Sequence, residues 1–327
     1  MPGFGSAFQW TRFSSILATL FFAISNVHGL VATSGHTENG TNWDKDGIST
    51  YARMKHGPDG ALFLDPYFLP YLFNLDGQIL LDAGCGAGPW GIIAAKNGAI
   101  VYGIDIQSGM IEKSKQAARE ELVENTTSFV VGDLALLPYP DNFFDRAISI
   151  NVGCNLPSLE PHLQELNRVL KKGGVAIITA PTSFGTVFTD GKRLHEEVIN
   201  SINQSLMDHQ VVDQDSFLQT IQGLDEIYRA TFAKKQGQWS LVVDEAVLES
   251  GEQIWRKLPM MMVPNHYHSE HEYTSLFIKE GFDIKQVYRS CFANEQEREK
   301  YNENRNDTLG NEYVMSPAFV VFVVEKS

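Results

Sequence analysis

The sequence predicts an α/β fold in which a doubly wound, mostly parallel sheet carries a ligand at one edge. Three observations favour this class. Short apolar runs alternate with helical patterns from residue 79 to residue 180. The first run passes directly into a glycine-rich loop, and polar residues follow several of the later runs. Because parallel strands end at a common edge, we expect these features to meet there.

The apolar run over residues 79–83 is typical of a short buried strand. Gly84, Gly86 and Gly88 follow it, and because they lack Cβ atoms the backbone can turn tightly and approach a ligand closely. Residues 90–97 predict a helix whose free N–H groups face the same place. This strand, loop and helix predict a nucleotide-type binding turn.

The glycines alone do not decide the ligand, because Gly86, Gly88 and Gly91 also match the dinucleotide fingerprint in a shifted register. Asp82 discriminates, since its carboxylate would repel a pyrophosphate but suits a ligand with an ammonium and a sulfonium group. Asp82, Gly84, Gly86 and Gly88 resemble the first motif, D-x-G-x-G-x-G, of the class I S-adenosylmethionine-dependent methyltransferases, in particular their type 11 group. The resemblance implies S-adenosyl-L-methionine as the cofactor.

A second apolar run, residues 99–104, ends at Asp105. This acidic residue lies about 20 residues after the loop, where a carboxylate accepts hydrogen bonds from ribose hydroxyls. Ile106 follows, and its side chain suits the face of an adenine ring. We therefore expect Asp105 and Ile106 to bind the nucleoside part of the cofactor.

The next two predicted strands, residues 127–131 and 144–151, end at further candidate residues. Gly132-Asp133-Leu134 resembles the adenine-edge motif of the same family. The resemblance implies that Asp133 accepts a hydrogen bond from the exocyclic amine, with Leu134 beside it. Asn151 closes the fourth strand at the same edge and is a further cofactor candidate.

A helix over residues 159–170 and a fifth strand over 175–180 follow. Near the C-terminus, residues 270–281 and 282–288 resemble the family's last helix and sixth strand, and residues 317–325 form an apolar run. The resemblance implies a seven-stranded, Rossmann-like sheet whose last strand is antiparallel.

Residues 183–269 are an insertion after the fifth strand. Apolar periodicity over residues 194–207 and 217–232 predicts a mainly helical insertion, with one extended segment over 239–243. A segment at this position lies over the carboxyl edge of the sheet, so we expect a lid on the acceptor side. The predicted parts are a targeting segment, a cofactor-binding core, this lid and the C-terminal part of the core: residues 1–40, 41–182, 183–269 and 270–327.

The insertion ends in the stretch His266-Tyr267-His268-Ser269-Glu270-His271. Its side chains are metal-ligand types, but their spacing matches no metal motif, so no metal is predicted. We expect His266 or His268 to act as a general base on an acceptor hydroxyl or amine, and Asn155 to orient the acceptor. The alternative stays open that Tyr267 and one histidine pack against or cap the next helix.

The formal net charge of −14 argues against nucleic-acid binding, which needs a basic face. The predicted function is in-line methyl transfer to a small molecule, with an apolar, aromatic, quinone or lipid-like acceptor. Two alternatives stay open: a catalytically silent S-adenosylmethionine-binding protein, and a NAD-dependent oxidoreductase.

The first 40 residues contain no acidic residue before Glu38 and include an apolar run over residues 16–27. This composition resembles a secretory signal peptide or a membrane anchor. We therefore expect a secreted or endoplasmic reticulum-associated protein, with membrane association through this segment. A cytoplasmic or mitochondrial location stays open, and nothing in the sequence indicates an oligomeric state.

Overall fold

The structure, a computed structural model, describes a chain with several gaps. The described residues are 65–183, 196–208, 230–235, 237–242, 248–258, 261–291 and 318–327, with a few isolated residues such as Thr186 and Phe217. They belong to one compact unit, Asn39–Ser327. The targeting segment predicted for residues 1–40 lies outside the described residues. No helix in the described part is both long and apolar enough to cross a membrane.

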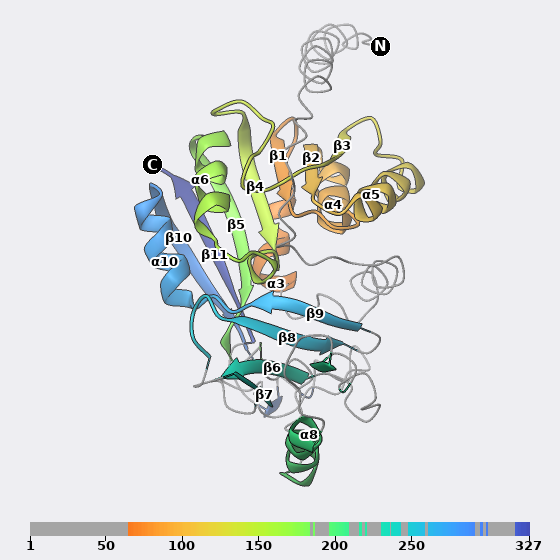
Figure 1. Cartoon of the computed structure of the whole chain (residues 1–327). Helices are drawn as coiled ribbons and strands as arrows, with labels where there is room; N and C mark the ends of the chain where they lie inside the picture. Colours follow the sequence, from red (N-terminus) through yellow and green to blue (C-terminus); the bar gives the residue numbers. More distant parts are fainter. Residues whose placement is uncertain are drawn as a thin grey trace, which may run out of the picture. The chain divides into compact units, whose positions relative to one another are not determined.

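A seven-stranded sheet forms the centre of the described unit (Figure 1). Its spatial order is β10-β11-β5-β4-β1-β2-β3. Strands β1 to β5 pair in parallel, and β11 runs antiparallel to both of its neighbours. The predicted fold class is therefore confirmed. The strands are β1 Ile79–Ala83, β2 Ile100–Asp105, β3 Thr127–Val131, β4 Phe144–Ile150, β5 Leu170–Pro181, β10 Phe282–Ser290 and β11 Phe319–Lys326.

Helices connect the parallel strands by crossovers. From β1 the chain moves outward through β2 to β3, whereas from β4 it moves the other way to β5. Because such crossovers are right-handed, α4 and α5 cover one face of the sheet and α6 covers the other, where α10 packs beside it (Figure 1). The elements are α3 Asp65–Phe68, η1 Leu69–Leu72, α4 Pro89–Lys96, α5 Ser108–Glu120, η2 Gly153–Asn155, α6 Glu160–Val169 and α10 Glu270–Lys279.

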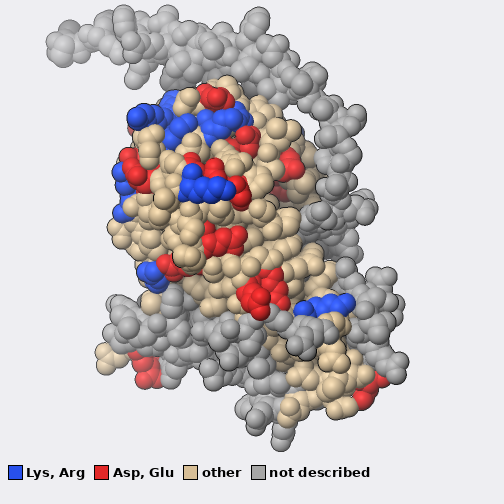
Figure 2. Space-filling view, turned by 60° about the vertical axis from the view of Figure 1, so that its left-hand side comes forward, with Lys and Arg blue, Asp and Glu red and all other residues tan. Residues whose placement is uncertain are grey.

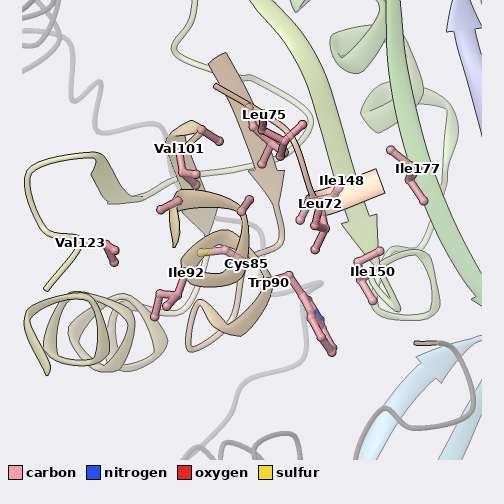
Figure 3. Close-up of a cluster of buried hydrophobic side chains, with 14 of the residues drawn as sticks. Leu72, Leu75, Cys85, Trp90, Ile92, Val101, Val123, Ile148, Ile150 and Ile177 are labelled. Carbon is pink, nitrogen blue, oxygen red and sulfur yellow. The ribbon is translucent and has the colours of Figure 1, made fainter. Parts of the chain in front are cut away.

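Buried apolar side chains hold β1 in the middle of this arrangement (Figure 3). Leu80 of β1 and Ile148 of β4 are both fully buried. Trp90, at the start of α4, packs edge-on against Phe68 with ring centroids 4.8 Å apart. The glycine-rich loop therefore leaves a strand that is packed on both faces, and burial of this apolar surface stabilises its position.

The prediction of a mainly helical insertion is wrong for its described part. The helix predicted over residues 194–207 is present as α8, Glu196–Asp208, but the other described elements form an antiparallel sheet of order β7-β6-β8-β9. Its strands are β6 Ala230–Lys235, β7 Gln238–Leu241, β8 Gln253–Leu258 and β9 Met261–His266. Phe232, placed at the end of a predicted helix, lies in β6.

Aromatic packing explains why this part is a sheet. Phe217 stacks on Trp239 of β7 with ring centroids 4.1 Å apart, and it meets Phe232 of β6 edge-on at 5.4 Å. Lys235 pairs with Gln238, and Gly237 has a φ angle of 84°, as a two-residue hairpin turn requires. The apolar spacing suggested a helix, but cross-strand aromatic contacts and this turn favour a hairpin.

Candidate functional site

The glycine-rich loop after β1 has three residues in the left-handed region. The φ angles of Gly84, Gly86 and Gly88 are 74°, 54° and 81°. The Gly84 and Cys85 N–H groups both donate to the Ile104 carbonyl of β2, at 2.8 and 3.0 Å. The loop is therefore fastened to the neighbouring strand, and its glycines allow a backbone course that side chains would strain.

The surroundings of the three glycines differ. A Cβ atom on Gly84 would lie 2.5 Å from a methyl group of Val152, and one on Gly88 would lie 2.9 Å from Ser114 Cβ. A Cβ atom on Gly86 would meet no heavy atom of the described residues within 4 Å. Gly84 and Gly88 are thus needed for packing, while Gly86 borders open space where a ligand can approach the backbone.

Asp82 has a partner inside the protein. Its side chain is buried, and its Oδ2 accepts a hydrogen bond of 3.0 Å from the Gly91 N–H in the first turn of α4. Asp82 therefore joins the strand end to the helix start, and its predicted attraction for a cationic ligand stays a prediction.

Asp105 connects two loops at the carboxyl edge. Its Oδ2 accepts from the Gly86 N–H and its Oδ1 accepts from the Gln107 N–H, both at 2.9 Å. Each carboxylate oxygen can accept a second hydrogen bond, so the predicted ribose contacts are compatible with this geometry. The neighbouring Ile106 side chain is 46% exposed, which suits a residue that a ligand would cover.

The segment after β3 lies next to Asp105. The Gly132 N–H donates to the Asp105 carbonyl at 3.0 Å, so both predicted nucleoside contacts belong to one edge. Asp133 is exposed, and its Oδ1 accepts from the Ala135 N–H at 2.9 Å. Leu134 is buried. The structure thus brings together the Asp105 and Asp133 regions, which are separated in sequence.

Asn151, at the end of β4, has a strained backbone with a φ angle of 56°. Its N–H donates to the Thr179 hydroxyl at 2.9 Å, and that hydroxyl donates back to its Oδ1 at 3.1 Å. Strain of this kind is often found at functional sites. Thr179 of β5 was not among the residues predicted from sequence, because a threonine inside an apolar strand carries no signal of its own.

Asn155 connects the core to the insertion. Its Oδ1 accepts a hydrogen bond of 3.0 Å from Asn265 Nδ2 of β9, and its Nδ2 donates to the Asn151 carbonyl at 3.4 Å. Asn265 is buried and was missed by sequence analysis, although a polar residue next to three methionines and a proline was a usable signal. The predicted role of Asn155 in orienting the acceptor stays a prediction.

His268 connects α10 to the residue that follows η2. It is buried, its Nε2 lies 2.8 Å from the Leu156 carbonyl, and its Nδ1 lies 3.1 Å from a carboxylate oxygen of Glu272. Ser269 caps α10 by accepting from the Glu272 N–H. Both ring nitrogens are bonded within the protein. This geometry favours the alternative that His268 packs against the next helix over its predicted role as a general base.

His266 is the better candidate for a base. Its ring is half-buried, and its Nδ1 has no hydrogen-bond partner among the described residues. Burial, with a smaller contribution from His268, lowers the pKa of His266 below its usual 6.5. The imidazole is therefore neutral near pH 7, which is the form that accepts a proton. Within the described part, no group of three or more acidic, histidine or cysteine side chains is arranged to hold a metal.

The segment that contains the glycine-rich loop matches a known protein family. Residues 81–178, which run from β1 into β5 and include the glycine-rich loop, match a family model described as a methyltransferase domain. They form a methyltransferase domain.

Relatives that match this chain are named as methyltransferases, several of them for sterols. A 24-methylenesterol C-methyltransferase of Arabidopsis thaliana is 34% identical over 133 residues, which is 39% of this chain and 36% of the relative. The methyltransferase GfsG of Streptomyces halstedii is 35% identical over 112 residues, 34% of this chain and 40% of the relative. The chain thus spans well under half the length of these curated relatives.

A solved structure has a similar fold. An S-adenosylmethionine-dependent methyltransferase from Mesorhizobium loti superposes with a TM-score of 0.53 over 83% of this chain and 100% of its own, at 17% identity. The similarity supports the architecture around the methyltransferase domain.

The charges around the methyltransferase domain are mixed. In the view of Figure 2, basic side chains lie beside acidic ones. Ion pairs of the described residues include Lys285 with Glu325, 3.0 Å apart, and Lys171 with Asp145, 2.6 Å apart.

Proposed function

We propose that the chain binds S-adenosylmethionine at the Gly84–Gly88 loop and transfers its methyl group to a small apolar acceptor. The observation that carries the proposal is the open space beside Gly86. This space lies next to a carboxylate, since the Gly86 N–H donates to Asp105. A backbone turn of this kind, with an acidic residue beyond the next strand, suits a nucleoside ligand with a cationic tail.

The chemistry divides between cofactor and protein. A bound S-adenosylmethionine supplies a methyl group already activated by its sulfonium. The chain's residues hold the reactants in line and exclude water. Asp105 and the loop backbone fix the nucleoside, and the acidic edge at Asp82 and Asp105 favours a cation. The neutral imidazole of His266 accepts a proton from an acceptor that is a weak nucleophile.

The acceptor class is proposed from the insertion and the relatives. β9 carries Pro264, Asn265 and His266 and ends at the junction with η2. The matched relatives are named for sterols or carry the general name methyltransferase. An apolar, lipid-like acceptor fits the sterol names of the relatives and the position of β9 beside η2, because small-molecule sites combine apolar walls with a few polar groups.

Calorimetric titration of the full chain tests the cofactor. We expect binding of S-adenosylmethionine and S-adenosylhomocysteine but not of NAD, and weaker binding of both sulfur nucleosides to Asp105→Ala. Asp283→Ala is the matched control, because this carboxylate is exposed on β10 at the far edge of the sheet. Binding of NAD alone, or of none of the three, would contradict the proposal.

We also propose that residues 1–40 direct the chain to the secretory pathway, as a cleaved signal or an anchor. The support is compositional: an apolar run without acidic residues. Expression of the full chain in eukaryotic cells, with fractionation and mass measurement of the N-terminus, tests this. Recovery from the cytosol with an intact N-terminus would contradict it.

A further inference from the structure

Two side chains of α6 hold the segment that follows β3. Arg168 uses all five of its N–H donors. Its Nη1 donates to the Tyr139 carbonyl and to Asp141, both at 2.8 Å. Its Nη2 donates to the Leu137 carbonyl at 2.9 Å. The remaining donors form a two-point contact with Glu165, at 2.7 and 2.8 Å. Because the guanidinium is planar and its donors point in set directions, these contacts fix the positions of its partners in addition to neutralising their charge.

Glu165 completes the contact from the other side. Its Oε2 accepts a hydrogen bond of 2.7 Å from the Leu137 N–H. The N–H and carbonyl groups of Leu137 are therefore both bonded to side chains of α6, which take the place of the neighbouring backbone that would bond them in a sheet. The hydrogen bonds from Arg168 lower the pKa of Glu165 and the same contact raises the pKa of Arg168. The contact therefore favours the charged forms of both side chains.

This contact lies a few residues beyond the predicted adenine contacts. Residues 132–141 start at Gly132, whose N–H donates to the Asp105 carbonyl, and end at the Arg168 contact. Asp133 and Leu134 lie between these two points. A third α6 residue, His162, is buried, and the Leu134 backbone and the charge of Asp133 both raise its pKa against the effect of burial. The segment is thus held at both ends and supported in the middle.

We propose that Glu165 and Arg168 are positioning residues for the nucleoside end of the cofactor site. They contact no ligand themselves. They restrict residues 132–141 to the conformation in which Asp133 and Leu134 meet the adenine edge beside Asp105. The proposal rests on the proposed function, because it assigns the adenine edge to Asp133 and Leu134.

The main test compares two nucleosides. Methylthioadenosine contains the adenosine part of the cofactor without its amino acid, whereas S-adenosylhomocysteine contains both. In Glu165→Gln, we expect the dissociation constants of both ligands to rise by the same factor, about tenfold, because about one molecule in ten keeps the binding conformation. Hydrogen exchange of the Leu137 amide is expected to accelerate in the same variant.

Glu325→Gln is the matched control. It makes the same chemical change in the Glu325–Lys285 pair, which joins β10 and β11 at the opposite edge of the sheet. We expect it to bind both nucleosides like the wild-type chain. The control separates positioning from general loss of stability, because a stability effect alone leaves the dissociation constants unchanged well below the melting temperature.

The outcomes distinguish the possible failures. Unchanged binding of both nucleosides in Glu165→Gln, with Asp133→Asn weakened, would overturn the positioning proposal and leave the proposed function standing. A loss confined to S-adenosylhomocysteine would also overturn it, because the effect would then lie at the amino-acid end. If the wild-type chain bound neither nucleoside, the proposed function would fail and the positioning proposal with it.

A milder variant covers the case in which Glu165→Gln does not fold. Asp141 is largely exposed, and Asp141→Asn weakens one of the Arg168 contacts without touching the core. We expect an increase of about twofold in both dissociation constants, since an exposed ion pair contributes only tenths of a kcal/mol. Identical constants for this variant and the wild-type chain would overturn the proposal.

Discussion

Single residues in the glycine-rich loop have similar backbone angles for different reasons. Gly84 and Gly86 both have positive φ angles, yet a side chain at Gly84 would overlap Val152, whereas one at Gly86 would enter open space. The first glycine therefore serves the packing of β1 against the end of β4. The second serves the approach of a ligand.

This difference predicts that two alanine substitutions affect stability and ligand binding to different extents. Gly84→Ala is expected to lower the free energy of unfolding by about 3 kcal/mol, because strain at positive φ adds to overlap with Val152. Gly86→Ala carries the strain alone, about 1 kcal/mol, but its methyl group occupies the proposed ligand space. Urea denaturation and S-adenosylhomocysteine titration measure the two effects. Equal loss of stability in both variants would contradict this division.

At the scale of elements, α10 approaches η2 closely at Tyr273 and Gly153. Tyr273 of α10 is fully buried and stacks on Phe322 of β11 with ring centroids 5.4 Å apart. Its hydroxyl has no hydrogen-bond partner among the described residues and lies where a Cβ atom of Gly153 would be, at 1.9 Å. The turn after β4 can therefore carry only glycine at this position.

A double-mutant cycle tests the contact between α10 and η2. Tyr273→Phe is expected to stabilise the protein by about 1 kcal/mol, because it removes a buried hydroxyl without a partner. Gly153→Ala alone should destabilise it strongly, and Tyr273→Phe should restore part of that loss by removing the overlapping oxygen. Thermal denaturation measures all three variants. Strictly additive effects would show that the two residues do not touch.

At the scale of the whole molecule, a buried histidine links acid stability to the fold. His162 of α6 is buried, and its Nε2 lies 3.1 Å from the Ser149 hydroxyl of β4. Burial lowers the pKa of His162 to about 4, while the Leu134 backbone and the charge of Asp133 oppose this shift in part. The unfolded chain binds the proton at a higher pH, since an exposed histidine has a pKa near 6.5.

The sign of the pH dependence follows from this difference. Above pH 6.5 the histidine is neutral in both states, and as the pH falls towards 4 only the unfolded state gains the proton. We expect the free energy of unfolding to fall over this window by about 3 kcal/mol more in the wild-type chain than in His162→Gln. Urea denaturation at several pH values measures it. Parallel pH profiles for the two proteins would contradict the assignment.

Much of the fold could be predicted because its signals are local. Residues 79–83 and 127–131 were predicted as strands with the bounds that the structure has, since each is an apolar run ended by turn residues. Strand β5 starts at Leu170 rather than at residue 175, because Leu170 already pairs with Phe144 of β4, before a register shift that leads to the pair of Arg146 with Val175. The sheet in the insertion was missed, because short amphipathic segments fit either helix or strand until a partner is present.

In the candidate site, too, local features were predictable from the sequence and tertiary contacts were not. The residue types at the strand ends and their order along the chain were readable from the sequence, because parallel strands end at one edge whatever the details of packing. Hydrogen-bond partners were not readable. Only the tertiary structure placed Asp82 on the Gly91 N–H, bonded both ring nitrogens of His268 within the protein, and left His266 as a half-buried neutral imidazole.

By itself, therefore, the sequence determined the sheet, the glycine-rich loop and the carboxylates after the strands, since spacing and residue type depend on neighbours in the chain. The tertiary structure decided which polar groups hold the protein together and which stay available to a ligand. The physical reason is that hydrogen-bond partners such as Arg168 with Leu137, or Asn155 with Asn265, come from distant parts of the chain. Burial, which sets the protonation of His162 and His266, is likewise a property of the assembled fold.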